Sequence, residues 1–148
     1  MDSTRRHLGS EFGLTLAGMR QRWRRVLDDR LRAQGLTEAT WRTMVYLLRG
    51  QDGCLQKDLA FAIGIEGPSL VRLLDTLEEA GFIERRAAAG DRRAKTVHMT
   101  PAGETRMADV QDMTDTIRDH LLGDISDDEL RLCEDVFRRI RDNAEKAG

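Results

Sequence analysis

The sequence predicts a mainly helical α+β fold with six helices and one small β-hairpin. The chain of 148 residues is close to the size of one domain, and only two prolines interrupt it. Its 40% hydrophobic and 34% charged residues are typical of a globular protein, so we expect disorder only at the ends. The elements follow from local periodicity and capping signals.

Two helices are expected in the N-terminal third. Apolar residues recur at three- and four-residue spacing over 11–35, which predicts one long amphipathic helix that ends before Gly35. Thr37 is a suitable N-cap, and Leu36 is placed to pack on Trp41 as a hydrophobic staple. A second helix therefore begins there and ends at the glycines 50 and 53.

A helix-turn-helix pattern follows. The third helix fits "QKDLAFAIG", in which Leu59 and Ile63 share a face and Gly64 supplies the stop. Pro68 stands at a first-turn position and opens the fourth helix, which Gly81 closes. The leucines of that helix point inward, so Ser69, Arg72 and Thr76 lie outward, as base-reading residues or as a solvated surface.

A cationic β-hairpin is expected next. Residues 82–86 and 95–99 alternate as strands do, with "AAAGDRRA" as the tip between them. Its five cations against Glu84 and Asp91 suit a DNA phosphate backbone and the narrow minor groove. The net charge of −2 does not exclude DNA, because residues 1–100 contain 17 Lys and Arg against 13 Asp and Glu.

Two further helices complete the chain. Pro101 opens a helix that runs to about Leu122, and Ser126 with Glu129 forms a capping box for the last one. The last helix carries one apolar stripe made of Leu130, Cys133, Val136, Phe137 and Ile140. A helical dimer interface explains this stripe better than intrachain packing, which stays open as the alternative.

These residues carry a family resemblance. The run "AIGIEGPSLVRLLDTLEEAGFIERRAAAGDRRAKTVHMTPAG" resembles the winged helix-turn-helix of the MarR family of bacterial transcriptional regulators, and "LTEATW" is similar to its SlyA-like branch. Met99 stands where the family usually has Leu, a volume-conserving difference. The resemblance implies an N-terminal dimerisation helix (1–36), a winged helix-turn-helix domain (37–100) and C-terminal dimerisation helices (101–148).

The resemblance also implies DNA-contacting residues outside the hairpin, namely Gln56, Lys57, Pro68, Ser69, Arg72 and Thr76. Arg72 would enter the major groove and bind base edges, with Pro68 and Ser69 beside it. Gln56 and Lys57 would lie against phosphates, where a helix N-terminus favours anions.

Within the hairpin, the resemblance implies that Arg92 enters the minor groove, with Arg93 and Lys95 also in the DNA-contacting set. Arg93 would pair with Asp91 and thereby hold the shape of the wing.

The expected partners are double-stranded DNA and a second copy of the chain. A homodimer would bind a pseudo-palindromic operator, acting most simply as a repressor. By position, Arg24 and Trp41 resemble residues that bind a small effector, either an aromatic carboxylate or an acyl thioester. Packing of Trp41 on Leu36 and a solvated Arg24 are the structural alternatives.

Other classes receive less support. We expect no enzyme, because no nucleophile elbow or phosphate loop is present, and no cofactor or metal, because His7, His98 and His120 are scattered. Cys54 and Cys133 are expected as small core residues. A thiol redox sensor using Cys54 and a winged-helix protein-interaction module remain the alternatives.

The cellular location follows from what the sequence lacks. It contains no apolar signal segment and no run of about 18 apolar residues. We therefore expect a cytoplasmic, nucleoid-associated bacterial protein without a membrane partner.

Overall fold

The structure, a computed structural model, describes residues 3–147 and confirms the mainly helical α+β class. Its six α-helices are α1 (Ser3–Leu31), α2 (Glu38–Tyr46), α3 (Gln56–Ile63), α4 (Gly67–Glu79), α5 (Pro101–Leu122) and α6 (Asp127–Ala147). Three strands, β1 (Cys54–Leu55), β2 (Ile83–Ala88) and β3 (Asp91–Met99), form one antiparallel sheet in the order β1-β3-β2. Arg32–Gln34 form a short 3-10 helix, and Leu47–Gln51 form a π-helical segment with non-helical backbone angles at Arg49 and Gly50.

Helix α1 is longer than the periodicity predicted. We expected it to start at residue 11, but it begins at Ser3: residues 3–10 contain no proline, and the helix continues through Gly9. Its end at Leu31, shortly before Gly35, is as predicted.

The predicted cap of α2 is confirmed, although the capping box uses an unexpected partner. The Thr40 amide donates to Thr37 Oγ1 at 3.1 Å, and the Thr37 amide donates to Thr40 Oγ1 at 2.9 Å. Two reciprocal bonds of this kind satisfy amides that the first turn leaves free. The start of the helix is therefore fixed by local sequence.

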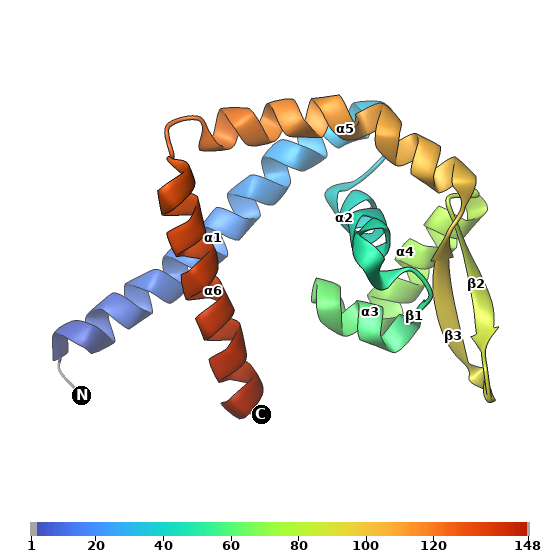
Figure 1. Ribbon diagram of the computed structural model, residues 1–148, viewed down its shortest axis with the longest axis horizontal. Coiled ribbons are helices and arrows are strands. Elements are labelled where there is room, and N and C mark those ends of the chain that lie inside the picture. The colour runs from blue at the N-terminus through green and yellow to red at the C-terminus, as the bar shows by residue number, and fades with distance from the viewer. Residues whose placement is uncertain (1–2, 148) are drawn as a thin grey trace. The chain divides into compact units, whose positions relative to one another are not determined.

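The helix-turn-helix is formed by α3 and α4, which lie beside α2 in Figure 1. Three residues separate the two helices, as is typical of this motif. Gly64 ends α3 with φ 66°, a left-handed conformation that favours glycine, and Pro68 lies in the first turn of α4. Both boundary signals are confirmed.

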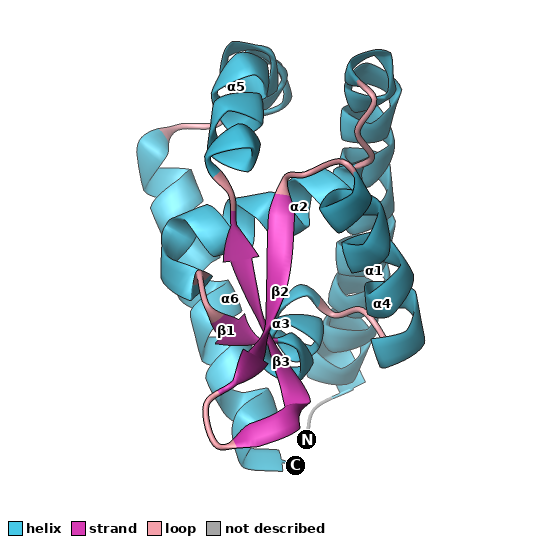
Figure 2. Cartoon of the chain, turned by 90° about the vertical axis from the view of Figure 1, so that its right-hand side faces the viewer, coloured by secondary structure: helices cyan, strands magenta, loops and turns pink. Residues whose placement is uncertain are grey.

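The hairpin β2–β3 is longer and its tip tighter than predicted. We expected residues 87–94 as an open tip, but the strands continue to Ala88 and Asp91, so that only two residues turn the chain. A register irregularity between Ala87 and Ala88 allows this extension. Figure 2 shows the two strands as a long ribbon with the short β1 at one side.

One apolar core holds the helix-turn-helix and the sheet together. Its buried members are Met44, Leu47, Leu59, Ile63, Leu70, Leu74, Leu77, Ile83, Val97 and Met107. Three of the ten come from α4, so the face of that helix opposite the core is left for other contacts.

The chain divides into two compact units, one up to Asp112 and one from Met113 onward. In the second unit, the predicted capping box of α6 is confirmed, because the Ser126 amide donates to Glu129 Oε2 at 2.9 Å. These hydrogen bonds hold the pKa of Glu129 below its ordinary value. Among residues 3–147, no helix is both long and apolar enough to cross a membrane.

Candidate nucleic-acid interface

Helix α4 presents the predicted base-reading residues in different settings. Pro68, Arg72 and Thr76 are exposed on the side away from the buried leucines. The Thr76 hydroxyl donates to the Arg72 carbonyl at 3.1 Å, a bond to its own helix that leaves its oxygen able to accept. Ser69 is exposed too, but it lines a hollow that α4 shares with α1 and α2.

The predicted wing cations Arg92, Arg93 and Lys95 are all exposed on β3. Arg93 and Lys95 line a cavity between the hairpin and α3, whereas Arg92 is not among its lining residues. The three cations are therefore not all directed at the same site.

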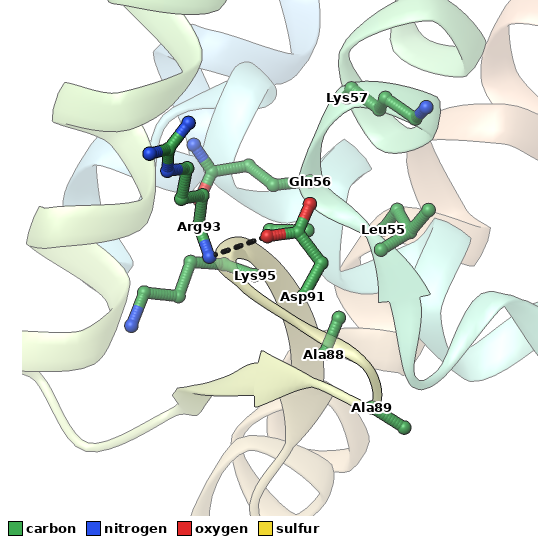
Figure 3. A pocket seen from close by; sticks show the side chains of 9 residues that line it. Leu55, Gln56, Lys57, Ala88, Ala89, Asp91, Arg93 and Lys95 are labelled. Carbon is green, nitrogen blue, oxygen red and sulfur yellow. Dashed lines mark hydrogen bonds between the residues drawn. The ribbon is translucent and has the colours of Figure 1, made fainter.

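Arg93 contacts Asp91 as expected, but through its main-chain amide and not through its guanidinium. Asp91 Oδ1 accepts a hydrogen bond of 2.9 Å from the main-chain amide of Arg93, and no ion pair joins the two side chains among the described residues. Figure 3 shows the Arg93 side chain pointing away from that carboxylate. An aspartate bonds most readily to an amide two residues ahead, so the carboxylate shapes the strand start and leaves the guanidinium free.

A cavity of about 540 Å³ lies between the start of α3 and the hairpin (Figure 3). Its lining includes four of the predicted DNA-contacting residues, which are Gln56, Lys57, Arg93 and Lys95, together with Asp91. Gln56 and Lys57 are the first residues of α3, where free amides add partial positive charge. The cavity thus combines three cationic side chains with a helix N-terminus, a combination that suits a phosphate group.

Arg85 is the residue that sequence reasoning placed wrongly. We counted it among the free wing cations, but its Nη2 donates to Asp75 Oδ1 at 2.5 Å and to Glu78 Oε2 at 2.6 Å. The hydrogen bond to Glu78 raises the pKa of Arg85, and the same bond lowers the pKa of Glu78. No local signal identifies this contact, because the partners lie seven and ten residues away.

Arg24 and Trp41, the predicted effector residues, line two different hollows. Arg24 lies in a cavity of about 880 Å³ formed by α1, α2 and the helix-turn-helix, and it also pairs with Asp28 at 3.5 Å. Trp41 lines a smaller cavity of about 360 Å³ together with Trp23. Arg20 and Arg42 line both cavities, although the sequence analysis singled out neither.

A buried carboxylate pairs with the two arginines that line both cavities. Glu38, only 2% exposed, pairs with Arg20 Nη2 at 3.1 Å and with Arg42 Nε at 3.2 Å. Burial lowers the pKa of Arg42, and the negative charge of Glu38 opposes that shift. Arg42 Nη1 also donates to the Ile63 carbonyl at 2.5 Å, which links the pair to the end of α3.

The expectation that both cysteines lie in the core holds in part for Cys54, which packs against the core cluster, and is wrong for Cys133. Cys54 is half-buried in β1, whereas Cys133 is exposed on α6. Burial raises the pKa of the Cys54 thiol, and the carboxylates of Asp58 and Asp52 raise it further. Redox-sensing thiols require the opposite shift, so this environment gives the redox alternative no support.

Comparison with known proteins is consistent with this geometry. The sequence model of the MarR family matches residues 34–94. The crystal structure of transcriptional regulator PA3341 is 41% identical in sequence, with a TM-score of 0.81 over 91% of this chain and 98% of that one. A structure of MarR is 27% identical, with a TM-score of 0.74 over 91% and 90% of the two chains.

Solved relatives of lower identity share the fold. The S. aureus MepR–DNA complex is 23% identical, with a TM-score of 0.74 over 89% of this chain and 97% of MepR. Six helices with a small three-stranded sheet match the winged-helix arrangement of these structures. The predictions of the family and of a non-enzymatic role are therefore confirmed, and the chain belongs to the MarR family, whose members are transcription regulators.

Proposed function

We propose that this chain is a dimeric, sequence-specific DNA-binding regulator that represses transcription from a pseudo-palindromic operator. The observation that carries the proposal is the cationic cavity between α3 and the hairpin, with Arg72 exposed on the neighbouring α4. MepR, which has the same fold, has been solved in a complex with DNA, and this supports the proposal.

In this proposal, α4 enters the major groove and the hairpin follows the backbone into the adjacent minor groove. Arg72 binds base edges beside Pro68, Ser69 and Thr76. The cavity at the start of α3 holds a backbone phosphate between two pairs of side chains, Gln56 with Lys57 and Arg93 with Lys95. Arg92, which does not line this cavity, enters the minor groove, where a narrow groove attracts arginine.

Binding to upstream DNA tests the proposal by fluorescence anisotropy over a salt series. The Arg72→Ala change is expected to cost about 1–3 kcal/mol and to relax preference at one base pair of each half-site. A uniform loss over all sequences would instead make Arg72 a phosphate contact.

The Arg92→Ala change is expected to weaken operator binding without unfolding the protein. Arg49→Ala is the matched control, because Arg49 is exposed, lies outside the proposed dimerisation segments and lines none of the three cavities described above. Unchanged operator affinity in Arg92→Ala would refute the wing assignment.

A homodimer is proposed because the last helix carries an uncovered apolar stripe. Phe137 and Ile140 are 40% and 41% exposed, and the described part of α6 has no buried residue. Exposed stripes of this kind mark protein interfaces, and a two-fold axis lets one surface pair with itself. We therefore propose residues 1–36 and 101–148 as dimerisation segments around a DNA-binding domain of residues 37–100.

Light scattering of the purified chain tests the dimer. Changing Phe137 and Ile140 together to Glu is expected to give monomers with weak operator affinity, because one recognition helix contacts only one half-site. The control Lys146→Glu, on the other side of α6, is expected to remain dimeric. A monomeric native chain at micromolar concentration would contradict the interface.

We also propose a small effector, an aromatic carboxylate or an acyl thioester, that releases the DNA. The two cavities beside Glu38 support this, because one offers Arg24 and the other the ring of Trp41. An effector acts only if it binds the DNA-free arrangement more tightly, by a few kcal/mol. The operator complex is titrated with compounds of both classes, and the titration is repeated with Arg24→Ala and Trp41→Ala to identify the site. If no compound releases the DNA, an effector of these classes is contradicted.

Two finer assignments complete the proposal. The segment "LTEATW" supports placement in the SlyA-like branch of the family. A DNA target supports a cytoplasmic, nucleoid-associated location in a bacterial cell, which fluorescence microscopy of a tagged chain tests.

A further inference from the structure

The wing is anchored to α4 by one arginine at its base. Arg85 Nε and Nη2 donate to Glu78 Oε2 at 3.1 and 2.6 Å, and Nη2 also reaches Asp75 at 2.5 Å. The main-chain amide of Arg85 donates to the other oxygen of Glu78 at 2.8 Å. Asp75 and Glu78 lie three residues apart on α4, so one side chain holds β2 against two successive turns of that helix.

This guanidinium is unsuited to contact a phosphate. The Arg85 side chain is only 18% exposed, and two carboxylates surround it, so the three groups together carry a net negative charge. Arg86, the next residue, has a side chain that is 60% exposed, and among residues 3–147 its one ion pair is with Glu84. Two adjacent arginines of one strand thus have different surroundings.

The position of Arg85 in the sheet gives the anchor its effect. Arg85 pairs with Val97, which pairs in turn with Cys54 of β1. One residue beyond, at Leu55, β1 ends, and the rest of the hairpin is a ribbon of two strands. Two strands alone are marginally stable, so the direction of the ribbon is set where it leaves the three-stranded sheet.

We propose that Arg85 is a positioning residue for DNA binding, which fixes the direction of the wing relative to α4 so that Arg92 and Arg72 reach adjacent grooves of one half-site. This inference rests on the proposed DNA-binding function. Arg85 itself contacts no DNA and acts through Arg92.

A double-mutant cycle on operator affinity tests the inference. In the native chain, Arg92→Ala is expected to lower the affinity about tenfold, whereas in the Arg85→Gln chain the same change lowers it less than about threefold, because the wing no longer delivers Arg92 to the groove. In the control chain Arg86→Gln, the tenfold effect is expected to persist. Equal effects of Arg92→Ala in all three chains would overturn the inference.

The salt dependence separates positioning from direct contact. Arg85→Gln is expected to leave the slope of log affinity against log salt unchanged, because no phosphate contact is lost. A slope reduced by about one unit would mean that Arg85 binds a phosphate, and the inference would be wrong. If Arg85→Gln does not fold, Arg85→Lys, which retains a cation, replaces it in the same cycle and is expected to give intermediate coupling.

Hydrogen exchange of the free protein tests, without DNA, whether Arg85 holds the hairpin to α4. In Arg85→Gln, the amides of residues 86–95 are expected to exchange faster, while those of the buried face of α4 stay protected. Unchanged exchange in the hairpin would overturn the inference even if the native chain binds DNA. Failure of the native chain to bind any DNA, with faster hairpin exchange in the variant, would contradict the proposed function and leave the anchor standing as a structural element only.

Discussion

Replacing Glu38 by Gln removes one buried negative charge from the junction of α1, α2 and α3. The side chain is 3% exposed, accepts a hydrogen bond from Arg20 and forms an ion pair with Arg42. The side chains of Arg20 and Arg42 are 43% and 25% exposed. Gln keeps the shape and one acceptor oxygen, so the variant isolates the charge. Arg42 then remains half-buried without a counterion.

The magnitude follows from the exposure of the partners. Breaking a fully buried pair costs about 3–5 kcal/mol, and breaking an exposed one about 0–1 kcal/mol. Because both arginines reach solvent, we expect Glu38→Gln to lower the free energy of unfolding by about 1–3 kcal/mol. For a domain of this size that corresponds to a decrease of about 1 M in the urea midpoint.

Urea unfolding at fixed protein concentration measures the loss in the free energy of unfolding. The control is Glu11→Gln, an exposed position on α1, which is expected to lie within about 0.5 kcal/mol of the native chain. Raising the salt to about 1 M is expected to reduce the difference only partly, because buried pairs are weakly screened. A variant as stable as the native chain would refute the reasoning and mean that water already compensates Arg42.

Three further outcomes are expected. In the double variant Phe137→Glu with Ile140→Glu, where the proposed dimer interface no longer covers Cys133, a thiol reagent at neutral pH should modify Cys133 much faster than Cys54, whose raised pKa and burial keep it protonated; equal rates by mass spectrometry would contradict this. Gly103→Ala should cost about 1–3 kcal/mol in urea unfolding, since a Cβ there would collide with a main-chain carbonyl of a neighbouring turn, while Gly9→Ala, where space is open, should not destabilise. The pKa of Glu78 in the folded protein lies below its ordinary 4.5, so the contribution of Glu78 to stability is present above that pH and is lost as the pH falls through the lowered value. Glu78→Gln should remove this part of the acid dependence. An unchanged profile of urea midpoints against pH would count against this reasoning.

Elements whose boundaries depend on neighbouring residues could be predicted from the sequence. The Thr37 cap, the Gly64 stop and the Ser126 capping box are confirmed because each is a contact within three or four residues. The family match over residues 34–94 covers the first two of these boundaries, and the Ser126 capping box lies outside it. Local chemistry therefore gave the order of elements and the surface on which the candidate cations lie.

Contacts between distant segments could not be predicted. Arg20 and Glu38 are 18 residues apart, and only packing of α1 on α2 brings them together. The tight tip of the hairpin depended on the register irregularity at Ala87, which no turn signal in "AAAGDRRA" revealed. Sequence reasoning therefore identified the charged residues of the hairpin without distinguishing Arg85, which is paired, from the free arginines.

The small cavity beside Glu38 can be followed by the intrinsic tryptophan fluorescence of the protein. The sequence contains two tryptophans, and both Trp23 and Trp41 line this one hollow between α1 and α2. Neither lies in α3, α4 or the hairpin, so their emission reports on the junction of α1 with α2 and not directly on the DNA-contacting elements. Intrinsic fluorescence can therefore follow occupancy of the cavity in the unlabelled, native chain.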